Sequence, residues 1–164
     1  MITGKAIVFG DNIDTDQIIG AHHLTLASIA EMAPFAFEHH LRFVGGFTPG
    51  DIIVGGENFG CGSSREQAVG VLKQRGAGAV VAAGFARIFF RNAINLGLPV
   101  IVCPRTAAIR PGERLEIDGD CLRVVETATS YPIEPLPSFI RDIAAHGGII
   151  AMLRNRAAGE VLKG

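Results

Sequence analysis

Between residues 51 and 103 the chain alternates short apolar runs with segments of helical periodicity, which limits the fold more than any other feature. Three apolar runs predict strands and the two segments between them predict helices, in the order 51–56, 63–76, 79–83, 85–96 and 98–103. Strand, helix, strand, helix, strand favours parallel strands joined by crossover helices. The sequence therefore predicts an α/β fold.

The flanking segments extend this sheet. A first buried strand is predicted at 5–10, and two apolar runs at 114–117 and 122–125 flank an Asp-Gly turn typical of a hairpin. Less regular segments are a possible helix within 24–44 broken near Pro34, a proline-rich stretch at 131–137, a helix at 138–148 and a short strand or helix in the tail from 149. We expect one compact domain over 1–164 with a mixed, largely parallel sheet.

Composition restricts the environment. Residues are 48% hydrophobic and 19% charged, which is richer in apolar residues than an average soluble domain. This excess predicts strands that are buried on both faces, or a face covered by a partner. No apolar run approaches the ~20 residues of a membrane span, and the start of the chain lacks a secretory signal. We expect a cytoplasmic protein without a membrane partner.

Charge and cysteine content exclude further classes. The net charge is −1, so no basic field favours nucleic acid. The three cysteines, Cys61, Cys103 and Cys121, are scattered and form no Cys-x-x-Cys pair. A disulfide framework is disfavoured, and so is a zinc or iron-sulfur site, which normally needs closely spaced thiols. We expect no metal ligation by this chain.

The segment 56–70, GENFGCGSSREQAVG, contains the main candidate site. Ligands of open α/β sheets bind beyond the carboxyl ends of strands, where loops enter helices. Glycines in this loop let backbone approach a ligand closely, and helix-start N–H groups attract anions. Arg65 adds a bidentate donor for a carboxylate. A carboxylate-binding site is one interpretation of this loop.

A purely structural interpretation fits the same residues. Ser63 and Glu66 match the capping box, with Ser63 as N-cap, and this pattern alone explains both. The known phosphate and nucleophile motifs do not occur here: the P-loop, the dinucleotide fingerprint and the nucleophile elbow. From the local pattern, capping and anion binding stay about equally favoured, and Arg65 shifts the balance toward binding.

Other candidate residues have bland alternatives. Two histidine pairs, His22-His23 and His39-His40, are weak metal candidates because adjacent histidines usually point apart. Cys61 is a reactive thiol near a helix start or, more simply, a small residue between glycines. Three acidic residues, Asp11, Asp14 and Asp16, suggest a cation site or Asx turns. Two arginines one helical turn apart, Arg87 and Arg91, are expected to face solvent or a partner.

Three segments carry a resemblance to a known family: GDNIDTDQII, NFGCGSSRE and GFARIFFRNAINLGLPV. In order and spacing they resemble the small subunits of 3-isopropylmalate dehydratase, which belong to the aconitase superfamily. The resemblance covers nearly the whole chain. It implies a swivelling β/β/α domain similar to aconitase domain 4, and a heterodimer or heterotetramer with a large subunit carrying a [4Fe-4S] cluster. It also implies isomerisation of a small 2-hydroxy dicarboxylate, a step of leucine biosynthesis, by dehydration and rehydration.

The resemblance also assigns residue roles. Ser63 corresponds to the family's base, Arg65 to its ligand for a substrate carboxylate and Ser64 to the neighbouring serine. Asp16 corresponds to an aspartate at the edge of the site. An alkoxide at Ser63 would need stabilisation, which helix-start N–H groups and a nearby arginine can give. The cap and the catalytic interpretations therefore share one geometry.

The segment 20–27 is expected to contact the substituent on the malate. Thr25 occupies the position at which homoaconitate-acting relatives have an arginine, and Leu24 and Leu26 flank it. This favours an alkylmalate such as 3-isopropylmalate over a tricarboxylate, because an unpaired buried carboxylate is costly. His22 and His23 qualify this expectation, since a protonated imidazole could supply a charge.

Three positions depart from the family pattern: Gln67 replaces a histidine, Gly20 a proline and His23 a tyrosine. They leave the substrate more open than the reaction type. The alternatives are a methylmalate, dimethylmalate or homoaconitate hydro-lyase, and a non-catalytic carboxylate-binding domain. RNA binding is disfavoured, because the net charge is −1 and the chain has a single Tyr.

Overall fold

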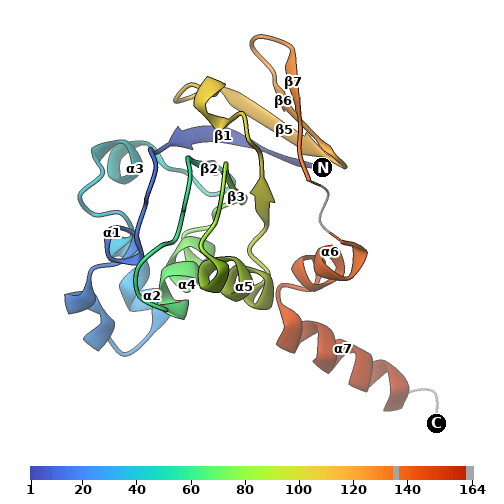
Figure 1. Cartoon of the computed structure of the whole chain (residues 1–164). Coiled ribbons are helices and arrows are strands. Elements are labelled where there is room, and N and C mark those ends of the chain that lie inside the picture. The colour runs from blue at the N-terminus through green and yellow to red at the C-terminus, as the bar shows by residue number, and fades with distance from the viewer. Residues whose placement is uncertain (135–136, 162–164) are drawn as a thin grey trace.

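The computed structural model describes residues 1–134 and 137–161 and contains a curled seven-stranded mixed sheet (Figure 1). The strand order is β4-β3-β2-β1-β5-β6-β7. The strands are β1 (Ile2–Val8), β2 (Ile52–Gly55), β3 (Ala79–Ala82), β4 (Val100–Val102), β5 (Arg114–Asp118), β6 (Cys121–Val124) and β7 (Thr129–Pro132). The predicted α/β class with a mixed sheet is confirmed.

The parallel half of the sheet follows the sequence prediction. β1, β2, β3 and β4 pair in parallel. The connections from β2 to β3 and from β3 to β4 contain α4 (Glu66–Gln74) and α5 (Arg87–Leu96). Gly76, expected at the helix stop, follows α4 with φ +83°, a conformation that glycine adopts at no steric cost. Both predicted crossover helices are confirmed.

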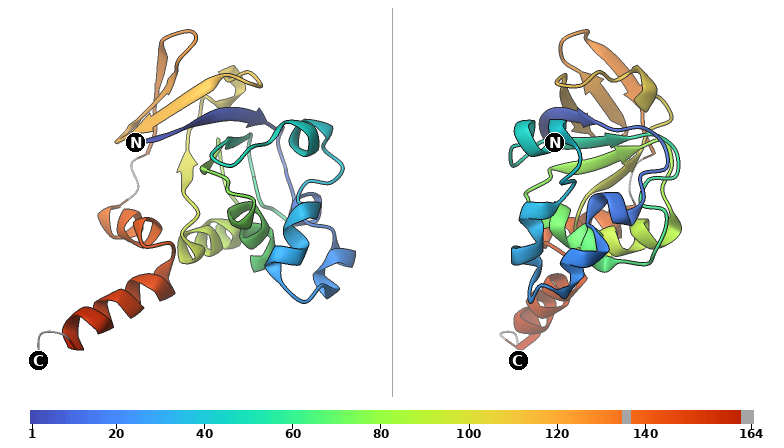
Figure 2. Two further views of the ribbon diagram at one scale, coloured as in Figure 1. Left: turned by 180° about the vertical axis from the view of Figure 1, so that it is seen from behind. Right: turned by 90° about the vertical axis from the view of Figure 1, so that its left-hand side faces the viewer.

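Strands β2 and β3 are buried on both faces, which accounts for the high apolar content. Alternate residues belong to two clusters. Ile53 and Val80 pack on the helix side with α4 and α5, whereas Val54 and Val81 face the other side. That second side is covered by the chain itself, because Leu115, Ile117, Leu122 and Val124 of the curled antiparallel strands complete its core. Figure 2 shows the β5–β7 strands bent away from the layer of helices.

The antiparallel half contains a strand that the sequence did not reveal. β5 and β6 form the expected hairpin, with Gly119 in its turn at φ +60°. β7 then pairs with β6 along the sheet edge, with Tyr131 opposite Leu122. Pro132 ends β7 opposite Cys121, and an edge strand tolerates proline because it has only one partner. Pro135 and Leu136 of the proline-rich stretch lie outside the described residues.

The segment 15–46 contains only short helices: α1 (Thr15–Ile18), η1 (Ala21–Thr25), α2 (Ile29–Met32), η2 (Ala33–Phe35) and α3 (Leu41–Gly46). The expected break near Pro34 is found, since Pro34 lies within η2. Phe37, Phe43 and Phe59 are fully buried in the helix-side core. Phe37 and Phe43 therefore anchor the segment 15–46 in this core, next to Phe59 of the later loop.

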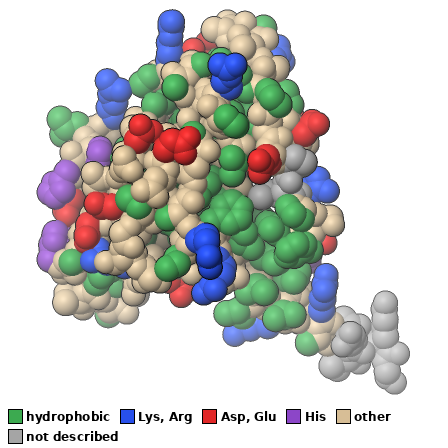
Figure 3. Space-filling view, viewed as in Figure 1, with side chains coloured by type: hydrophobic (Ala, Val, Ile, Leu, Met, Phe, Trp, Pro, Cys, Tyr) green, Lys and Arg blue, Asp and Glu red, His purple; other side chains and the backbone are tan. Residues whose placement is uncertain are grey.

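The last part of the described chain is helical. It consists of α6 (Ser138–Ala145), as predicted, and α7 (Ile149–Val161). The tail, for which the sequence left a strand or a helix open, is therefore a helix. α7 leads away from the sheet (Figure 2) and contacts α5 and α6. Exposed hydrophobic side chains on these helices are Ile88, Phe139, Ile150 and Leu153. Figure 3 shows hydrophobic side chains gathered on this face of the molecule. Among the described residues, no helix combines the length and apolar character needed to cross a membrane.

Candidate active site

The site is built on two loops that continue the pairing of β1 and β2. Loop A (residues 9–19) follows β1, and loop B (residues 56–65) follows β2. Four backbone hydrogen bonds join the loops: Gly56 N to Gly10 O at 3.0 Å, Asn12 N to Glu57 O at 2.8 Å, Gly60 N to Ile13 O at 2.7 Å and Thr15 N to Cys61 O at 2.9 Å. The candidate residues of both loops are therefore held at the carboxyl edge of the parallel strands.

Side chains add to this connection. Asp11 Oδ1 accepts from the Glu57 backbone N–H at 2.8 Å, and Asp14 caps α1 by accepting from Gln17 N at 2.8 Å. Gln17 returns the contact to the backbone of Asp14, which completes a capping box. Asp11 and Asp14 thus have structural hydrogen bonds of the turn-forming kind. The interpretation as Asx-type turns accounts for them better than a cation site.

Gly60 lets loop B lie close to α5, which leads to a stability prediction. Its φ is +80°, and an added Cβ would collide with the ring of Phe89. Gly60→Ala is therefore expected to lower the free energy of unfolding by about 1–3 kcal/mol. Chemical denaturation measures this value, with Gly10→Ala as control, because a Cβ at Gly10 meets nothing within 4 Å. Equal stability of both variants would show that loop B does not need this approach.

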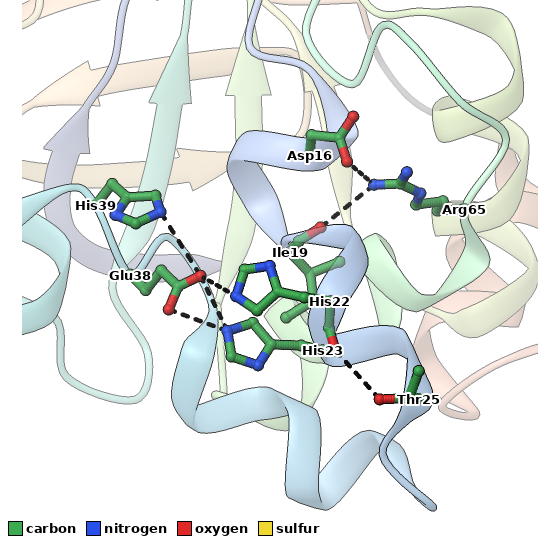
Figure 4. A network of polar contacts seen from close by, with 8 residues as sticks. All are labelled: Asp16, Ile19, His22, His23, Thr25, Glu38, His39 and Arg65. Carbon is green, nitrogen blue, oxygen red and sulfur yellow. Dashed lines mark hydrogen bonds and ion pairs between the residues drawn. The ribbon is translucent and has the colours of Figure 1, made fainter.

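Arg65 and Asp16 bring the two loops together at their charged ends (Figure 4). Arg65 Nη1 forms an ion pair with Asp16 Oδ1 and also points at the carbonyl oxygen of Ile19 at 3.5 Å. The Arg65 side chain is 16% exposed, whereas Asp16 is 58% exposed. Both contacts use Nη1, so the other guanidinium donors have no hydrogen-bond partner in the part of the chain that the structure describes. The structure thus unites two residues that are 49 positions apart in sequence.

The interpretation of Ser63 as N-cap is wrong. Arg65 occupies the N-cap position of α4, which begins at Glu66, and no side chain caps the helix. The physical reason is that other bonds hold the backbone of Ser63. Its carbonyl oxygen accepts from Thr15 Oγ1 at 3.0 Å and from Arg65 N at 2.9 Å. This tight turn places the helix start two residues later than predicted, so a capping box does not account for Ser63 and Glu66. Anion binding by this loop stays a prediction.

Ser63 and Ser64 are exposed on the loop that leads into α4. Thr15 and Arg65 both hydrogen-bond the Ser63 carbonyl oxygen, which fixes the backbone at this residue. Its side-chain hydroxyl has no hydrogen-bond partner among the described residues. Cys61 pairs through its backbone with loop A and is half-buried, which suits its interpretation as a small residue between glycines. Two hydroxyls and one guanidinium therefore share the rim of loop B.

The segment 20–27 lies next to the Arg65 contact. It follows Ile19 directly, and its helix η1 presents Thr25 at the surface, where Thr25 Oγ1 donates to His22 O at 3.2 Å. Leu24 and Leu26 are half-buried and pack against the helix-side core. Their apolar surface is therefore shared between the core and the exterior, while Thr25 is the exposed member of the three.

Sequence reasoning missed a cluster of ionisable side chains next to this segment. His22 and His23 do not point apart, because both Nε2 atoms approach Glu38, at 3.4 and 2.9 Å from Oε1 (Figure 4). The hydrogen bond from His23 is the main cause that lowers the pKa of the Glu38 carboxyl below its ordinary value. His40 faces the other way, onto the rings of Phe9 and Phe37, and desolvation lowers its pKa. No spacing in the sequence indicated that Glu38 would join the two histidines.

The cysteines of this chain do not fit a cluster site. Cys61 lies in loop B, Cys121 begins β6, and Cys103 follows β4 and is buried in the second core. Burial raises the pKa of the Cys103 thiol, which disfavours the thiolate that a metal needs. All three are free thiols. Their separation on different elements offers no donor set for iron and sulfide.

Comparisons with known proteins give a consistent family. Residues 48–105, which contain loop B, α4, β3, α5 and β4, match the model of the aconitase C-terminal domain. The chain is 46% identical to 3-isopropylmalate dehydratase small subunit 1 of Archaeoglobus fulgidus, over 94% of this chain and 99% of that protein. It is 43% identical to the 3-isopropylmalate dehydratase small subunit of Moorella thermoacetica, over 98% and 99%.

A solved structure agrees with these relatives. The crystal structure of 3-isopropylmalate dehydratase from Methanocaldococcus jannaschii superimposes with a TM-score of 0.92 at 40% sequence identity, and the match covers 99% of both chains. This likeness confirms the fold that the sequence resemblance implied.

Proposed function

The chain belongs to the family of 3-isopropylmalate dehydratase small subunits, and we propose from this premise that it isomerises 2-isopropylmalate to 3-isopropylmalate together with a large subunit. The observation that carries the residue assignment is the junction of loops A and B. The pairing of Arg65 with Asp16, and the exposed Ser63 and Ser64 just before Arg65 in loop B, support this assignment. Dehydration and rehydration of a 2-hydroxy dicarboxylate needs such a combination of base and carboxylate ligand.

Ser63 is the base of the proposed reaction. It removes a proton from the carbon next to a carboxylate, the hydroxyl leaves the neighbouring carbon, and water then adds with the opposite regiochemistry. A serine is a weak base until its alkoxide is stabilised. The guanidinium of Arg65 two residues away, and the uncapped start of α4, supply positive potential on this side of the loop.

Arg65 binds a substrate carboxylate in this proposal. Nη1 is already oriented by Asp16 and by the Ile19 carbonyl, so the guanidinium plane is fixed before substrate arrives. A fixed fork loses less entropy when it binds a carboxylate than a free side chain does. Asp16 is the positioning residue for Arg65, and Ser64 offers a further hydroxyl at the same rim.

The proposal places the iron-sulfur chemistry in the large subunit. When bound there, a [4Fe-4S] cluster supplies a Lewis acid for the leaving hydroxyl. This chain contributes the proton acceptor and the carboxylate ligand. The division agrees with the dispersed thiols described above.

Co-expression with candidate large subunits tests the proposed function. We expect the purified pair, under anaerobic conditions, to dehydrate 2-isopropylmalate, and this chain alone to be inactive. Activity of this chain alone with stoichiometric iron would contradict the division of labour. A complex that binds small carboxylates without turnover would instead support a non-catalytic binding domain.

Substrate choice yields a second prediction. Thr25 is exposed and carries no charge, so a tricarboxylate would lack a partner for its extra carboxylate. We expect kcat/KM to be higher for isopropylmalate than for homocitrate. Thr25→Arg is expected to shift this ratio by about tenfold toward homocitrate, because it adds a charge partner worth about 1.4 kcal/mol or more. Assaying 2-methylmalate alongside separates the alkylmalate alternatives.

The matched control for this variant is Thr129→Arg, at an exposed position of β7. It adds the same side chain to the antiparallel edge of the sheet and should leave the ratio unchanged. If the wild type prefers homocitrate, or if both variants behave alike, segment 20–27 does not set the specificity.

A further inference from the structure

We propose that the cluster of His22, His23 and Glu38 is a binding site for a divalent transition-metal ion of the zinc class, with His39 as an additional ligand. Imidazole nitrogens and a carboxylate oxygen are the donors that Zn²⁺ takes in proteins. One donor atom from each of His22, His23 and Glu38 lies within 4.8 Å of the others. None of these side chains takes part in the reaction proposed above.

The distances leave room for an ion beside the hydrogen bonds that His23 Nε2 makes to both Glu38 oxygens, at 2.9 and 3.0 Å. Nε2 of His23, His22 and His39 lies at 2.9, 3.4 and 3.7 Å from the same oxygen, Glu38 Oε1. Ordinary hydrogen bonds to this oxygen would be about 2.7–3.2 Å long, which explains His23 only. Ligands of tetrahedral zinc at about 2.0–2.1 Å from the metal are about 3.3 Å apart. The three separations surround that value.

Packing fixes His23 in place. The ring of His23 stacks on Phe35, with centroids 3.9 Å apart and planes 13° apart, and its other neighbour is the ring of His22 at 3.9 Å. The His23 side chain is only 13% exposed, whereas His22 is 67% exposed and open to an incoming ion. The stacked ring cannot turn freely, so its Nε2 is preorganised toward Glu38.

The backbone conformation at Phe37 directs the Glu38 side chain toward the histidines. Phe37, the preceding residue, is fully buried and has φ +52°, which is uncommon for a bulky residue. Its N–H donates to the Ile18 carbonyl at 2.9 Å. This conformation sends the Phe37 ring into the core and Glu38 toward the histidines. A strained residue beside convergent polar groups is typical of a functional site.

Gly20 provides the space for the cluster. A Cβ at this position would overlap the ring of His22 and lie 3.4 Å from Glu38 Oε1. The φ of Gly20 is −61°, so other residues could adopt its backbone conformation. What the missing side chain supplies is room for His22 to reach the carboxylate. An ion at this point would join η1 to the segment that follows η2.

Metal titration of the full, tag-free chain at neutral pH tests the proposal. We expect about one Zn²⁺ per chain by calorimetry and elemental analysis, and a rise in thermal stability that grows with free Zn²⁺. Co²⁺ should give the visible d–d absorption of nitrogen and oxygen ligation without the near-ultraviolet thiolate charge-transfer band. A thiolate band would assign the ion to cysteine and overturn the proposal.

Variants separate the cluster from adventitious binding. Glu38→Gln, which keeps the shape of the side chain, and His22→Ala, at an exposed ring, are each expected to weaken Zn²⁺ binding more than about tenfold. Gly20→Ala should also weaken it, because the added Cβ displaces the His22 ring although every ligand residue is still present. His146→Ala is the control, because His146 is an exposed histidine that bonds the Asp142 carbonyl on α6. Absence of binding to the wild type, or equal loss in the control, would overturn the site.

Discussion

Ser63→Ala is expected to lower kcat of the two-subunit enzyme by about 10²–10⁴-fold, because a positioned base contributes on this scale. The structure also predicts that this variant loses activity without losing stability. Since Ser63 does not cap α4 and its bonds to Thr15 and Arg65 involve the backbone, the variant should unfold within about 0.5 kcal/mol of wild type. Anaerobic steady-state kinetics and denaturation of the same preparation measure both quantities.

The control for Ser63→Ala is Ser130→Ala, at an exposed position of β7. It removes the same hydroxyl far along the sheet and should change neither rate nor stability. Ser63→Ala with a near-normal rate would remove Ser63 from the chemistry. A normal rate together with clear destabilisation would assign the serine a structural role that its exposed side chain does not suggest.

Arg65→Lys is expected to raise KM by about 10–100-fold, the equivalent of losing a charge-assisted hydrogen bond to a carboxylate. A lysine keeps the charge but lacks the planar fork, and it cannot pair with Asp16 and a substrate carboxylate at once. The structural cost should be small, because the backbone bonds between loops A and B do not involve the guanidinium. Initial rates over a range of 2-isopropylmalate concentrations give KM and kcat separately.

Arg123→Lys is the matched control, since Arg123 pairs with Glu116 at 3.4 Å on the antiparallel strands. It makes the same exchange in another arginine–carboxylate pair and should leave KM unchanged. An unchanged KM in Arg65→Lys would exclude Arg65 as a substrate ligand. A lowered kcat at constant KM would instead assign Arg65 to stabilising the transition state.

The parallel half of the sheet and its helices were predictable because each element has a local sequence signal. Apolar runs such as 79–83 and glycine stops such as Gly76 fall where buried strands and helix ends need them. β7 was missed because it is an edge strand that pairs only with β6 and can contain Pro132, so it lacks the apolar pattern of a buried strand. The short helices of residues 15–46 depend on tertiary contacts of buried phenylalanines, which no local periodicity encodes.

For the candidate site, prediction succeeded for local patterns that form in the structure. It failed where tertiary contacts override a local pattern. Ser63-x-x-Glu66 has the form of a capping box, yet a bond from Thr15 holds the Ser63 carbonyl. The capping box that forms is Asp14 with Gln17, a pattern visible in the sequence. The convergence of His22 and His23 on Glu38 depends on the turn at Phe37, which the sequence does not signal.

The hydrogen bonds between loops A and B have a consequence for how the candidate site can change in evolution. The bonds that hold Asn12, Ile13 and Thr15 against Glu57, Gly60 and Cys61 run between main-chain groups. The exposed side chains of the rim can therefore change without breaking them, as long as Asp11, Thr15 and Gly60 keep their own contacts. Mutations can therefore sample new chemistry at the rim while the alignment of the two loops is inherited from the sheet. The alignment of the two loops and the exposed side chains of the rim are thus encoded by different positions of the chain.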